Sequence, residues 1–560
     1  MPTTTQSQDP FDRVRELASR YSDERASAAY LLCDRHPAGN LAYRVVGADL
    51  EATDLTYGDL RTASERLASA LADLGVSPGD RVATLTGKSV EYLVTLMAIW
   101  RLGAVHVPLF TAFAPAAIAL RLAGSAAKVV VCDENQQAKL APSAEIPADA
   151  SWQVITTAPE HLVPPTALRF AELLAAKNPG LPAASLGGDA PLIHIYTSGT
   201  TGRPKGVVVP IKALAGFQAY AEFGLGLRSD DVFWCAADPG WAYGLYFGVL
   251  ASFTTGIPSL LLQGGFDAEA TYEVLSRYQV TNLAAAPTVY RSLRAAPVAA
   301  PRILKLRCAS SAGEPLTPEV NEWAVGALGV PVHDHYGQTE AGMLVNNHHH
   351  PALKRPLKDG SMGIPMPGWE VRVLRQLEDA PAPDGEIGRV AVEVPRSPLA
   401  WFTGYLNDPE KSAEKFAGAG RWYLTGDVGW KDEGGYFHFS SRDDDVIIMA
   451  GYRIGPFEVE SVLATHPVVR ECAVIAVPDD IRGEVLEAFV VLRSDVKPST
   501  NIVQDLQQWV KVGYAAHAYP RNVHFIESLP KTPSGKVQRF VLRQKRREEL
   551  AATKCNSDPQ

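Results

Sequence analysis

The chain has little of what nucleic-acid-binding and secreted proteins need. Its 560 residues carry 53 Lys and Arg against 62 Asp and Glu, a formal net charge of −9 at pH 7. Because there is no basic excess to neutralise a phosphate backbone, we expect no nucleic-acid partner. A local pocket could still bind phosphate groups at this net charge.

Cysteine is also scarce. The six cysteines, at positions 33, 132, 235, 308, 472 and 555, have neither metal-ligand nor disulfide-framework spacing. The segment Met1–Gln6 lacks the charged and then apolar pattern of a signal peptide. Together these features predict a reducing compartment, and we expect a cytoplasmic protein with mostly buried, inert thiols.

Long uncharged runs are nearly absent. One stretch, between Asp238 and Asp267, is long enough to suggest a membrane span, but Pro258 and several glycines interrupt it. It is more typical of buried core elements joined by turns, so no membrane span is predicted. His348, His349 and His350 form a polar run mid-chain without Cys or carboxylate partners at ligand spacing, which favours a solvated loop over a metal site.

What is present is a globular composition with alternating helix and strand patterns. Hydrophobic residues are 46% and charged residues 21%, which excludes wholesale disorder. Apolar periodicity predicts helices over 58–74, 92–102 and 116–123, and strands over 81–85, 104–107 and 128–131. Repeated strand–helix–strand units indicate an α/β fold with buried parallel strands, whereas 140–188 resembles a surface excursion.

A second, smaller α/β pattern begins after about residue 440. Strands are expected over 472–476 and 488–492, followed by a helix over 502–512. The last residues, 551–560, are expected to be a disordered tail.

The strongest local signal is the segment Tyr196–Gly206, with the sequence YTSGTTGRPKG. Its glycines let backbone N–H groups face one point, its hydroxyls add donors, and Lys205 adds a cation, which together suit a polyphosphate. The Walker pattern does not fit, because Pro204 precedes Lys205 and Gly206 follows it. A flexible linker is the alternative, but the apolar flanks 192–195 and 207–209 predict two buried strands joined by a phosphate loop.

This loop resembles that of the ANL superfamily, which contains acyl- and aryl-CoA synthetases, non-ribosomal adenylation domains and beetle luciferases. Four further segments resemble the family's other motifs in the same order along the chain. They are Tyr336–Glu340, Tyr423–Asp427, Arg442–Asp444 with Gly451–Arg453, and Pro530–Lys536. The resemblance covers nearly the whole chain and is greatest for short- to medium-chain acyl-CoA synthetases.

The resemblance implies an MgATP site. Thr339 would contact the α-phosphate and Glu340 would bind Mg²⁺, since joining two anions requires positive charge and a metal. The remaining nucleotide-binding candidates, in the loop and around the nucleoside, are Thr197, Ser198, Gly199, Thr200, Thr201, Gly202, Lys205, Gly313, Glu314, Pro315, Asp334, Tyr336, Gln338, Asp427, Arg442 and Arg453. Asp427 and Arg442 would hold the ribose, because a carboxylate can accept both hydroxyl protons of a diol.

The family's fold implies a large composite N-terminal domain, with parallel and mixed sheets flanked by helices, and a small mobile α+β C-terminal domain. We expect boundaries at 1–441, 442–445 for the hinge, 446–550 and 551–560. The C-terminal domain would rotate about Asp444, presenting the catalytic Lys536 for adenylation and then Gly451 beside a tunnel for coenzyme A.

Trp241, Tyr243 and Gly337 are expected to line the acid pocket. Acetate-specific relatives carry Trp where Gly337 stands, so an open pocket and an acid larger than acetate are predicted. Cations beyond the motifs are not evident there, which favours a monocarboxylate.

The sequence thus predicts an acyl-CoA synthetase that uses ATP, Mg²⁺ and coenzyme A, as a monomer or homodimer. Because Ala516–Ala518 replaces the cation-bearing segment common in the family, coenzyme A is less well supported than ATP. The alternatives are transfer to a carrier-protein thiol, an acetyl- or propionyl-CoA synthetase, a luciferase-like oxidative enzyme, or a degenerate binding regulator.

Overall fold

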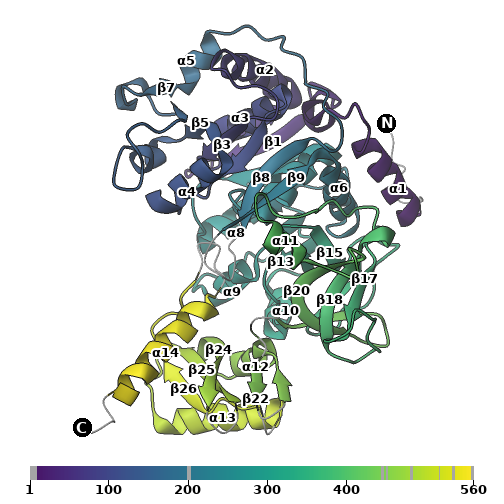
Figure 1. Cartoon of the computed structure of the whole chain (residues 1–560), viewed down its shortest axis with the longest axis vertical. Coiled ribbons are helices and arrows are strands. Elements are labelled where there is room, and N and C mark those ends of the chain that lie inside the picture. Colours follow the sequence, from purple (N-terminus) through teal and green to yellow (C-terminus); the bar gives the residue numbers. More distant parts are fainter. Residues whose placement is uncertain are drawn as a thin grey trace. The chain divides into compact units, whose positions relative to one another are not determined.

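The computed structural model describes residues 9–197, 204–442, 445, 447–449, 452–479, 483–515, 518–531 and 537–555. Two compact units divide the chain: Met1–Val371 with Glu393–Arg421, and Arg372–Val392 with Trp422–Gln560. Figure 1 follows the chain through both units. The expected domain boundaries at 441 and 445 stay predictions.

The first unit contains a seven-stranded sheet in the order β7-β6-β5-β3-β4-β8-β9. Its strands are β3 (Arg81–Leu85), β4 (Val105–Pro108), β5 (Ala127–Cys132), β6 (Gln153–Thr156), β7 (Ala167–Arg169), β8 (Pro191–Thr197) and β9 (Lys205–Pro210). The helices that accompany them are α2 (Tyr57–Asp73), α3 (Val90–Leu102), α4 (Pro115–Ser125) and α5 (Phe170–Ala175). β3 pairs in parallel with both β4 and β5. The predicted parallel α/β layer is therefore confirmed, and the segment expected as a surface excursion supplies its edge strands.

A second sheet of this unit runs in the order β16-β15-β14-β13-β12-β10-β11-β1-β2. Its strands are β1 (Leu41–Val46), β2 (Ala52–Thr56), β10 (Phe233–Cys235), β11 (Ser259–Leu262), β12 (Asn282–Ala285), β13 (Cys308–Ala312), β14 (Val332–Gln338), β15 (Gly342–Asn346) and β16 (Ser361–Pro365). The other α-helices of the unit are α1 (Pro10–Tyr21), α6 (Leu214–Phe223), α7 (Ala251–Thr255), α8 (Ala268–Arg277), α9 (Pro287–Ala295), α10 (Pro318–Ala327) and α11 (Pro409–Ala413), and a short strand, β19 (Phe416–Ala417), follows them. Between β10 and α7 the chain forms a buried π-helix, η5 (Gly244–Leu250).

The second unit begins with strands in the order β17-β18-β20-β21 and continues with β23-β22-β25-β24, with β26 paired to β25. These strands are β17 (Val371–Leu374), β18 (Gly388–Glu393), β20 (Trp422–Lys431), β21 (Phe437–Arg442), β22 (Ile447–Met449), β23 (Tyr452–Ile454), β24 (Val469–Asp479), β25 (Gly483–Leu492) and β26 (Asn522–Phe525). Its helices are α12 (Pro456–Ala464), α13 (Thr500–Gly513) and α14 (Arg539–Cys555), of which α14 enters the segment expected as a disordered tail. The expected C-terminal strands and helix are confirmed.

The uncharged stretch after Asp238 forms buried turns, η5, α7 and β11, as its glycines predicted. No helix within the described residues combines the length and apolarity needed to cross a bilayer. The expectation for the histidine run was wrong. His348, His349 and His350 are 2%, 8% and 8% exposed, and burial lowers the pKa of His348 to about 4 and holds that of His349 well below its usual range.

Candidate active site

The predicted phosphate loop joins the ends of two buried antiparallel strands. β8 and β9 pair so that Thr197 lies opposite Lys205, at the base of the loop. The prediction of two strands flanking the loop is confirmed. Ser198, Gly199, Thr200, Thr201 and Gly202 lie outside the described residues.

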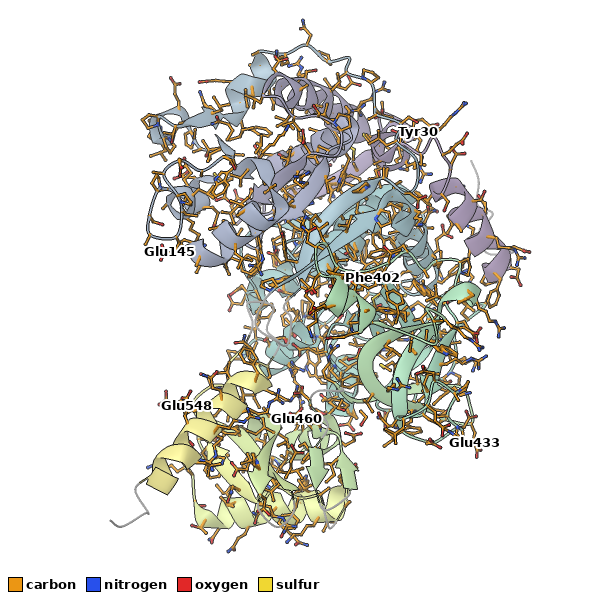
Figure 2. All side chains as sticks on the ribbon, in the orientation of Figure 1. Tyr30, Glu145, Phe402, Glu433, Glu460 and Glu548 are labelled. Atoms are coloured by element: carbon orange, nitrogen blue, oxygen red, sulfur yellow. The ribbon has the colours of Figure 1, made fainter. Side chains whose placement is uncertain are left out.

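One tyrosine connects the loop's lysine with the predicted metal carboxylate. The Nζ of Lys205 lies 5.0 Å from the centroid of the Tyr405 ring. The Tyr405 hydroxyl donates a hydrogen bond of 2.8 Å to Oε1 of Glu340. A β-bridge between Val207 and Tyr405 fixes this arrangement, and Phe402, labelled in Figure 2, packs at 5.1 Å from the Tyr405 ring.

The Glu340 carboxylate is suited to bind Mg²⁺. It is half-buried just after β14, and its Oε2 accepts no hydrogen bond from any described residue. Mg²⁺ is usually bound by one or two protein carboxylates, with water and substrate phosphates completing its shell. A single oriented carboxylate therefore fits the ion. The neighbouring residue, Thr339, is also held by a hydrogen bond, since the Tyr246 hydroxyl donates to its carbonyl at 3.2 Å.

The predicted adenine segment leaves β13 through a glycine with a positive φ. Gly313 has φ 102°, a conformation that favours glycine. The carboxylate of Glu314 accepts a hydrogen bond of 2.6 Å from Arg291 of α9 and longer ones from Thr288. Glu314 is thus held in place.

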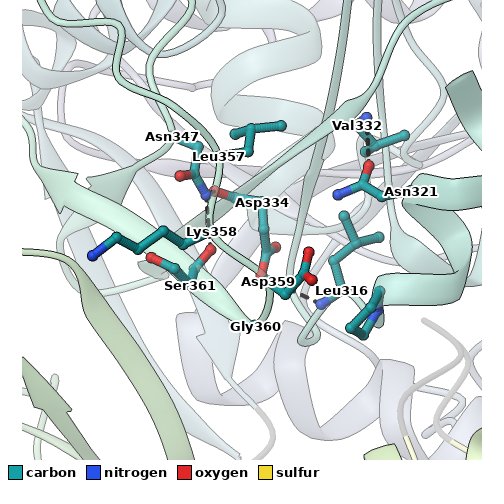
Figure 3. Close-up of a pocket in the computed structure, with 11 residues that line it drawn as sticks. Leu316, Asn321, Val332, Asp334, Asn347, Leu357, Lys358, Asp359, Gly360 and Ser361 are labelled. Atoms are coloured by element: carbon teal, nitrogen blue, oxygen red, sulfur yellow. Dashed lines mark hydrogen bonds between the residues drawn. The ribbon is translucent and has the colours of Figure 1, made fainter. Parts of the chain in front are cut away.

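Asp334, on β14, contacts the residue that follows this segment. Its Oδ2 accepts from the Leu316 N–H at 3.3 Å, whereas Oδ1 is buried without a hydrogen bond from the described residues. Burial raises the pKa of Asp334 to about 8, so its carboxyl is largely protonated at pH 7 and can donate as well as accept. It faces a pocket of about 20 Å³, room for about one water molecule, which Lys358 and Asn347 also line (Figure 3).

Two of the predicted acid-pocket residues lie between β10 and η5. The half-buried Trp241 ring packs 5.1 Å from Phe110 and 5.7 Å from Phe113. Its Nε1 is buried and has no partner within the described part of the chain. The turn is tight, since a Cβ on Gly244 would lie 2.2 Å from the Asp238 carbonyl oxygen.

Gly337 lies opposite Met343, beside a register shift between β14 and β15. A Cβ there would meet the Gly342 carbonyl oxygen at 2.3 Å and Met343 Sδ at 2.6 Å. The direction in which a Gly337 side chain would extend is therefore filled, in part by Met343. The role of Gly337 in the acid pocket stays a prediction.

In the second unit, Asp427 and Arg442 face each other across β20 and β21. Arg442 donates a hydrogen bond of 2.8 Å to Oδ1 of Asp427. The Asp427 N–H donates to Thr425 Oγ1, whose own hydroxyl donates to the Val390 carbonyl. The two predicted ribose contacts thus form one ion pair, and the Thr425 hydroxyl connects the Asp427 backbone to the Val390 carbonyl.

Known proteins resemble this chain over nearly all its length. Residues 33–406 match the AMP-binding enzyme family, and 458–536 match the AMP-binding enzyme C-terminal domain. The chain belongs to this family. It is 36% identical to an uncharacterized acyl-CoA ligase, YtcI, of Bacillus subtilis, over 89% of this chain and 92% of the relative.

Two further relatives extend the comparison. Identity is 34% to the acetyl-coenzyme A synthetase of Bacillus subtilis, over 93% of this chain and 90% of the relative. A crystal structure of Brucella canis acyl-CoA synthetase is 42% identical and covers 97% of this chain and 98% of its own, with a TM-score of 0.74. The chain is an acyl-CoA synthetase of the ANL superfamily, an AMP-forming acid–thiol ligase that uses ATP and coenzyme A.

Several expected residues of the synthetase lie where the structure does not describe them. Asp444, Gly451 and Lys536 are outside the described residues, as is the side chain of Arg453. Tyr336 and Gln338 are half-buried in β14. The roles expected for these residues stay predictions.

The synthetase also contains a group of three buried histidines whose ligand nitrogens lie within 4.8 Å of one another: His333, His335 and His349. The His333 and His349 rings stack, with centroids 3.7 Å apart and an interplanar angle of 18°. Nearly parallel rings direct their in-plane lone pairs alongside each other, so they do not converge on an ion as tetrahedral coordination requires. This geometry favours hydrogen bonding over metal binding.

Tyr405 is the site residue that sequence reasoning missed. It lies 65 residues from Glu340 and in none of the five motifs. Its position before the helix-starting pair Asp408-Pro409 gave no signal for a contact with the predicted metal carboxylate, Glu340.

Proposed function

We propose that this synthetase activates a monocarboxylic acid larger than acetate, of short or medium chain, branched or aromatic. The supporting observation is the aromatic wall formed by Trp241, Phe110 and Phe113 beside the expected acid pocket. Such a wall favours an apolar acyl group, because burying its carbon atoms removes apolar surface from water.

The charges beside this wall support a monocarboxylate. Lys88, in the loop after β3, and Asp238, after β10, are both half-buried. Burial lowers the pKa of Lys88 and raises that of Asp238, while the attraction between the two opposes both shifts. Since their charges offset each other, this pair leaves no net positive charge for a second carboxylate. Arg121, the other cation beside the wall, is stacked 4.1 Å from the Phe113 ring centroid and donates to the Ala117 carbonyl.

In the first half-reaction, the acid's carboxylate attacks the α-phosphorus of ATP, giving acyl-AMP and pyrophosphate. Thr197, Lys205 and the rest of the phosphate loop would hold the phosphates, and Glu340 would hold Mg²⁺. When bound, the ion neutralises phosphate charge. Tyr405 would orient the Glu340 carboxylate, and Lys536 would stabilise the negative charge that develops in the transition state.

In the second half-reaction, the thiol of coenzyme A attacks the acyl carbon and AMP leaves. We assign the ribose to the Asp427–Arg442 pair, the hinge to Asp444 and the thiol tunnel to Gly451. The proposal includes a rotation of the C-terminal domain about Asp444 between the two half-reactions.

Acetate or propionate is the second candidate, favoured by the 34% identity to an acetyl-coenzyme A synthetase. Transfer to a carrier-protein thiol is the other alternative. We include a cytoplasmic location, supported by the burial of the thiols of Cys33, Cys132, Cys235 and Cys308, and a monomeric or homodimeric state in the proposal.

The test is a panel of C2–C10, branched and aromatic acids, assayed for pyrophosphate release with and without coenzyme A. Highest kcat/KM for an acid larger than propionate, with AMP release that depends on coenzyme A, supports the proposal. Highest kcat/KM for acetate or propionate contradicts the expected size, and AMP release that is indifferent to coenzyme A contradicts the acceptor.

A further inference from the structure

A buried chain of hydrogen bonds starts at Tyr243, in the expected acid pocket. The Tyr243 and Tyr220 hydroxyl oxygens lie 3.0 Å apart, and the Tyr220 oxygen lies 2.7 Å from Nδ1 of His335. The other ring nitrogen of His335, Nε2, lies 3.0 Å from the carbonyl oxygen of Asn347. Four segments contribute: α6, the turn before η5, β14 and the residues after β15.

The far end of this chain fixes the direction of every hydrogen bond in it. A carbonyl oxygen only accepts, so Nε2 of His335 must carry a proton. Burial holds the pKa of His335 well below its usual range, so the ring is neutral and Nδ1 is an acceptor. Tyr220 therefore donates its single proton to Nδ1.

The direction of the hydrogen bond between Tyr220 and Tyr243 follows by the same reasoning. With its proton committed to His335, the Tyr220 oxygen can only accept from Tyr243. Tyr243 therefore donates inward and keeps only oxygen lone pairs for any other partner. Tyr220 is 0% exposed, whereas Tyr243 is half-buried and lies two residues from Trp241, so Tyr243 is the more exposed of the two tyrosines in this hydrogen-bond chain.

We propose that the Tyr243 hydroxyl oxygen accepts a hydrogen bond from a hydroxyl group on the acyl part of the substrate, so that the preferred acids are hydroxy-substituted. This inference rests on the proposed function, since it places the acyl group beside Trp241 and Tyr243. An unsubstituted acid would displace water from Tyr243 without replacing its hydrogen bond, and an ether oxygen would meet lone pairs with lone pairs. A neutral hydrogen bond of about 1–1.5 kcal/mol corresponds to roughly five- to tenfold in kcat/KM.

The wild-type enzyme provides the first test. Matched sets of C4–C8 alkanoic and benzoic acids, each unsubstituted, hydroxylated or methoxylated at successive positions, are compared by kcat/KM for pyrophosphate release. At the position that reaches Tyr243, we expect the hydroxy acid to exceed its parent about five- to tenfold and the methoxy acid to fall below the parent.

Two variants then test the direction of the chain. Tyr243→Phe should abolish the hydroxyl preference. Tyr220→Phe should release the Tyr243 proton toward the ligand and raise kcat/KM for the methoxy acid relative to its parent. A purely structural role would lower kcat/KM for all three acids by the same factor. Tyr290→Phe is the matched control. This tyrosine is also fully buried, but its hydroxyl donates to the Ser310 carbonyl, which is not part of the Tyr243–Tyr220–His335 hydrogen-bond chain.

The outcomes separate this proposal from the one on which it rests. One outcome is that the parent acids support pyrophosphate release but no position shows a preference for a hydroxyl group. That result overturns the role of Tyr243 and leaves the proposed synthetase function intact. The same holds if Tyr220→Phe, folded and active, leaves the hydroxy-to-methoxy ratio unchanged. Pyrophosphate release from no acid at all overturns the proposed function itself.

Discussion

Tyr405 offers the most direct test of the phosphate end of the site. Replacing it with Phe removes one hydroxyl and keeps the ring near Lys205. The lost hydrogen bond, 2.8 Å long, ends on a carboxylate. Hydrogen bonds to charged groups contribute about 1.5–3 kcal/mol, and losing a group that orients a metal ligand typically costs about 10–100-fold in metal affinity or activity.

The assay is the magnesium dependence of pyrophosphate release at fixed ATP and acid. We expect the half-saturating Mg²⁺ concentration of Tyr405→Phe to rise about 10–100-fold, with most of kcat restored at saturating metal. Tyr405→Ala should show the same shift and, in addition, a higher KM for ATP. That variant also removes the ring 5.0 Å from Lys205, a contact worth about 0.5–1 kcal/mol at exposed sites.

A tyrosine with other partners supplies the control. The Tyr278 hydroxyl donates to the Leu50 carbonyl, so Tyr278→Phe loses a hydrogen bond that involves neither Glu340 nor Lys205. An unchanged magnesium half-saturation in Tyr405→Phe, with Tyr278→Phe also unchanged, would refute the orienting role of Tyr405. A shift of the same size in both variants would refute its specificity.

Three further predictions follow from the same structure. Gly337→Ala should lower the free energy of unfolding by about 1–3 kcal/mol in urea denaturation, because its Cβ would lie 2.3 Å from a backbone oxygen; an unchanged midpoint would contradict the close packing. The pKa of His333 is lowered to about 4 by burial, so its contribution to stability is complete above the unfolded pKa near 6.5 and is lost as pH falls toward 4. Urea titrations should therefore show a shallower loss of stability from pH 6.5 to 4 in His333→Gln than in wild type, and equal slopes would count against this titration. Asp427→Asn should weaken AMP binding about tenfold by calorimetry, since Arg442 loses its charged partner. Glu433→Gln, at an exposed position, should leave the affinity for AMP unchanged. Equal AMP affinities of Asp427→Asn and the wild type would contradict the ribose assignment.

Sequence patterns predicted those parts of the fold in which local periodicity and burial agree. The helix expected over 58–74 is α2, and the strand expected over 81–85 is β3, because apolar side chains there recur with the period of the element that buries them. The strands flanking the phosphate loop followed from their apolar residues for the same reason.

The sequence misled where polar residues are buried by tertiary contacts. The run His348–His350 has the composition of a solvated loop, yet the His349 ring finds acceptors on β13, about 40 residues earlier in the chain. Tyr405 meets Glu340 only because its segment pairs with β9. Neither contact has a local signature, since each depends on which strands are neighbours.

The π-helix η5 sets the direction of the residues that precede it. A π-turn places one more residue in the turn than an α-turn does, so η5 is equivalent to an α-helix with an inserted residue. Deleting one residue within Gly244–Leu250 would let the segment close as an α-helix and rotate what precedes it by about 100°. Tyr243 and Trp241 would then turn away together from their present partners. Chain length at this point, rather than side-chain identity alone, therefore sets where Trp241 and Tyr243 point, and with them the shape of the acid pocket proposed above.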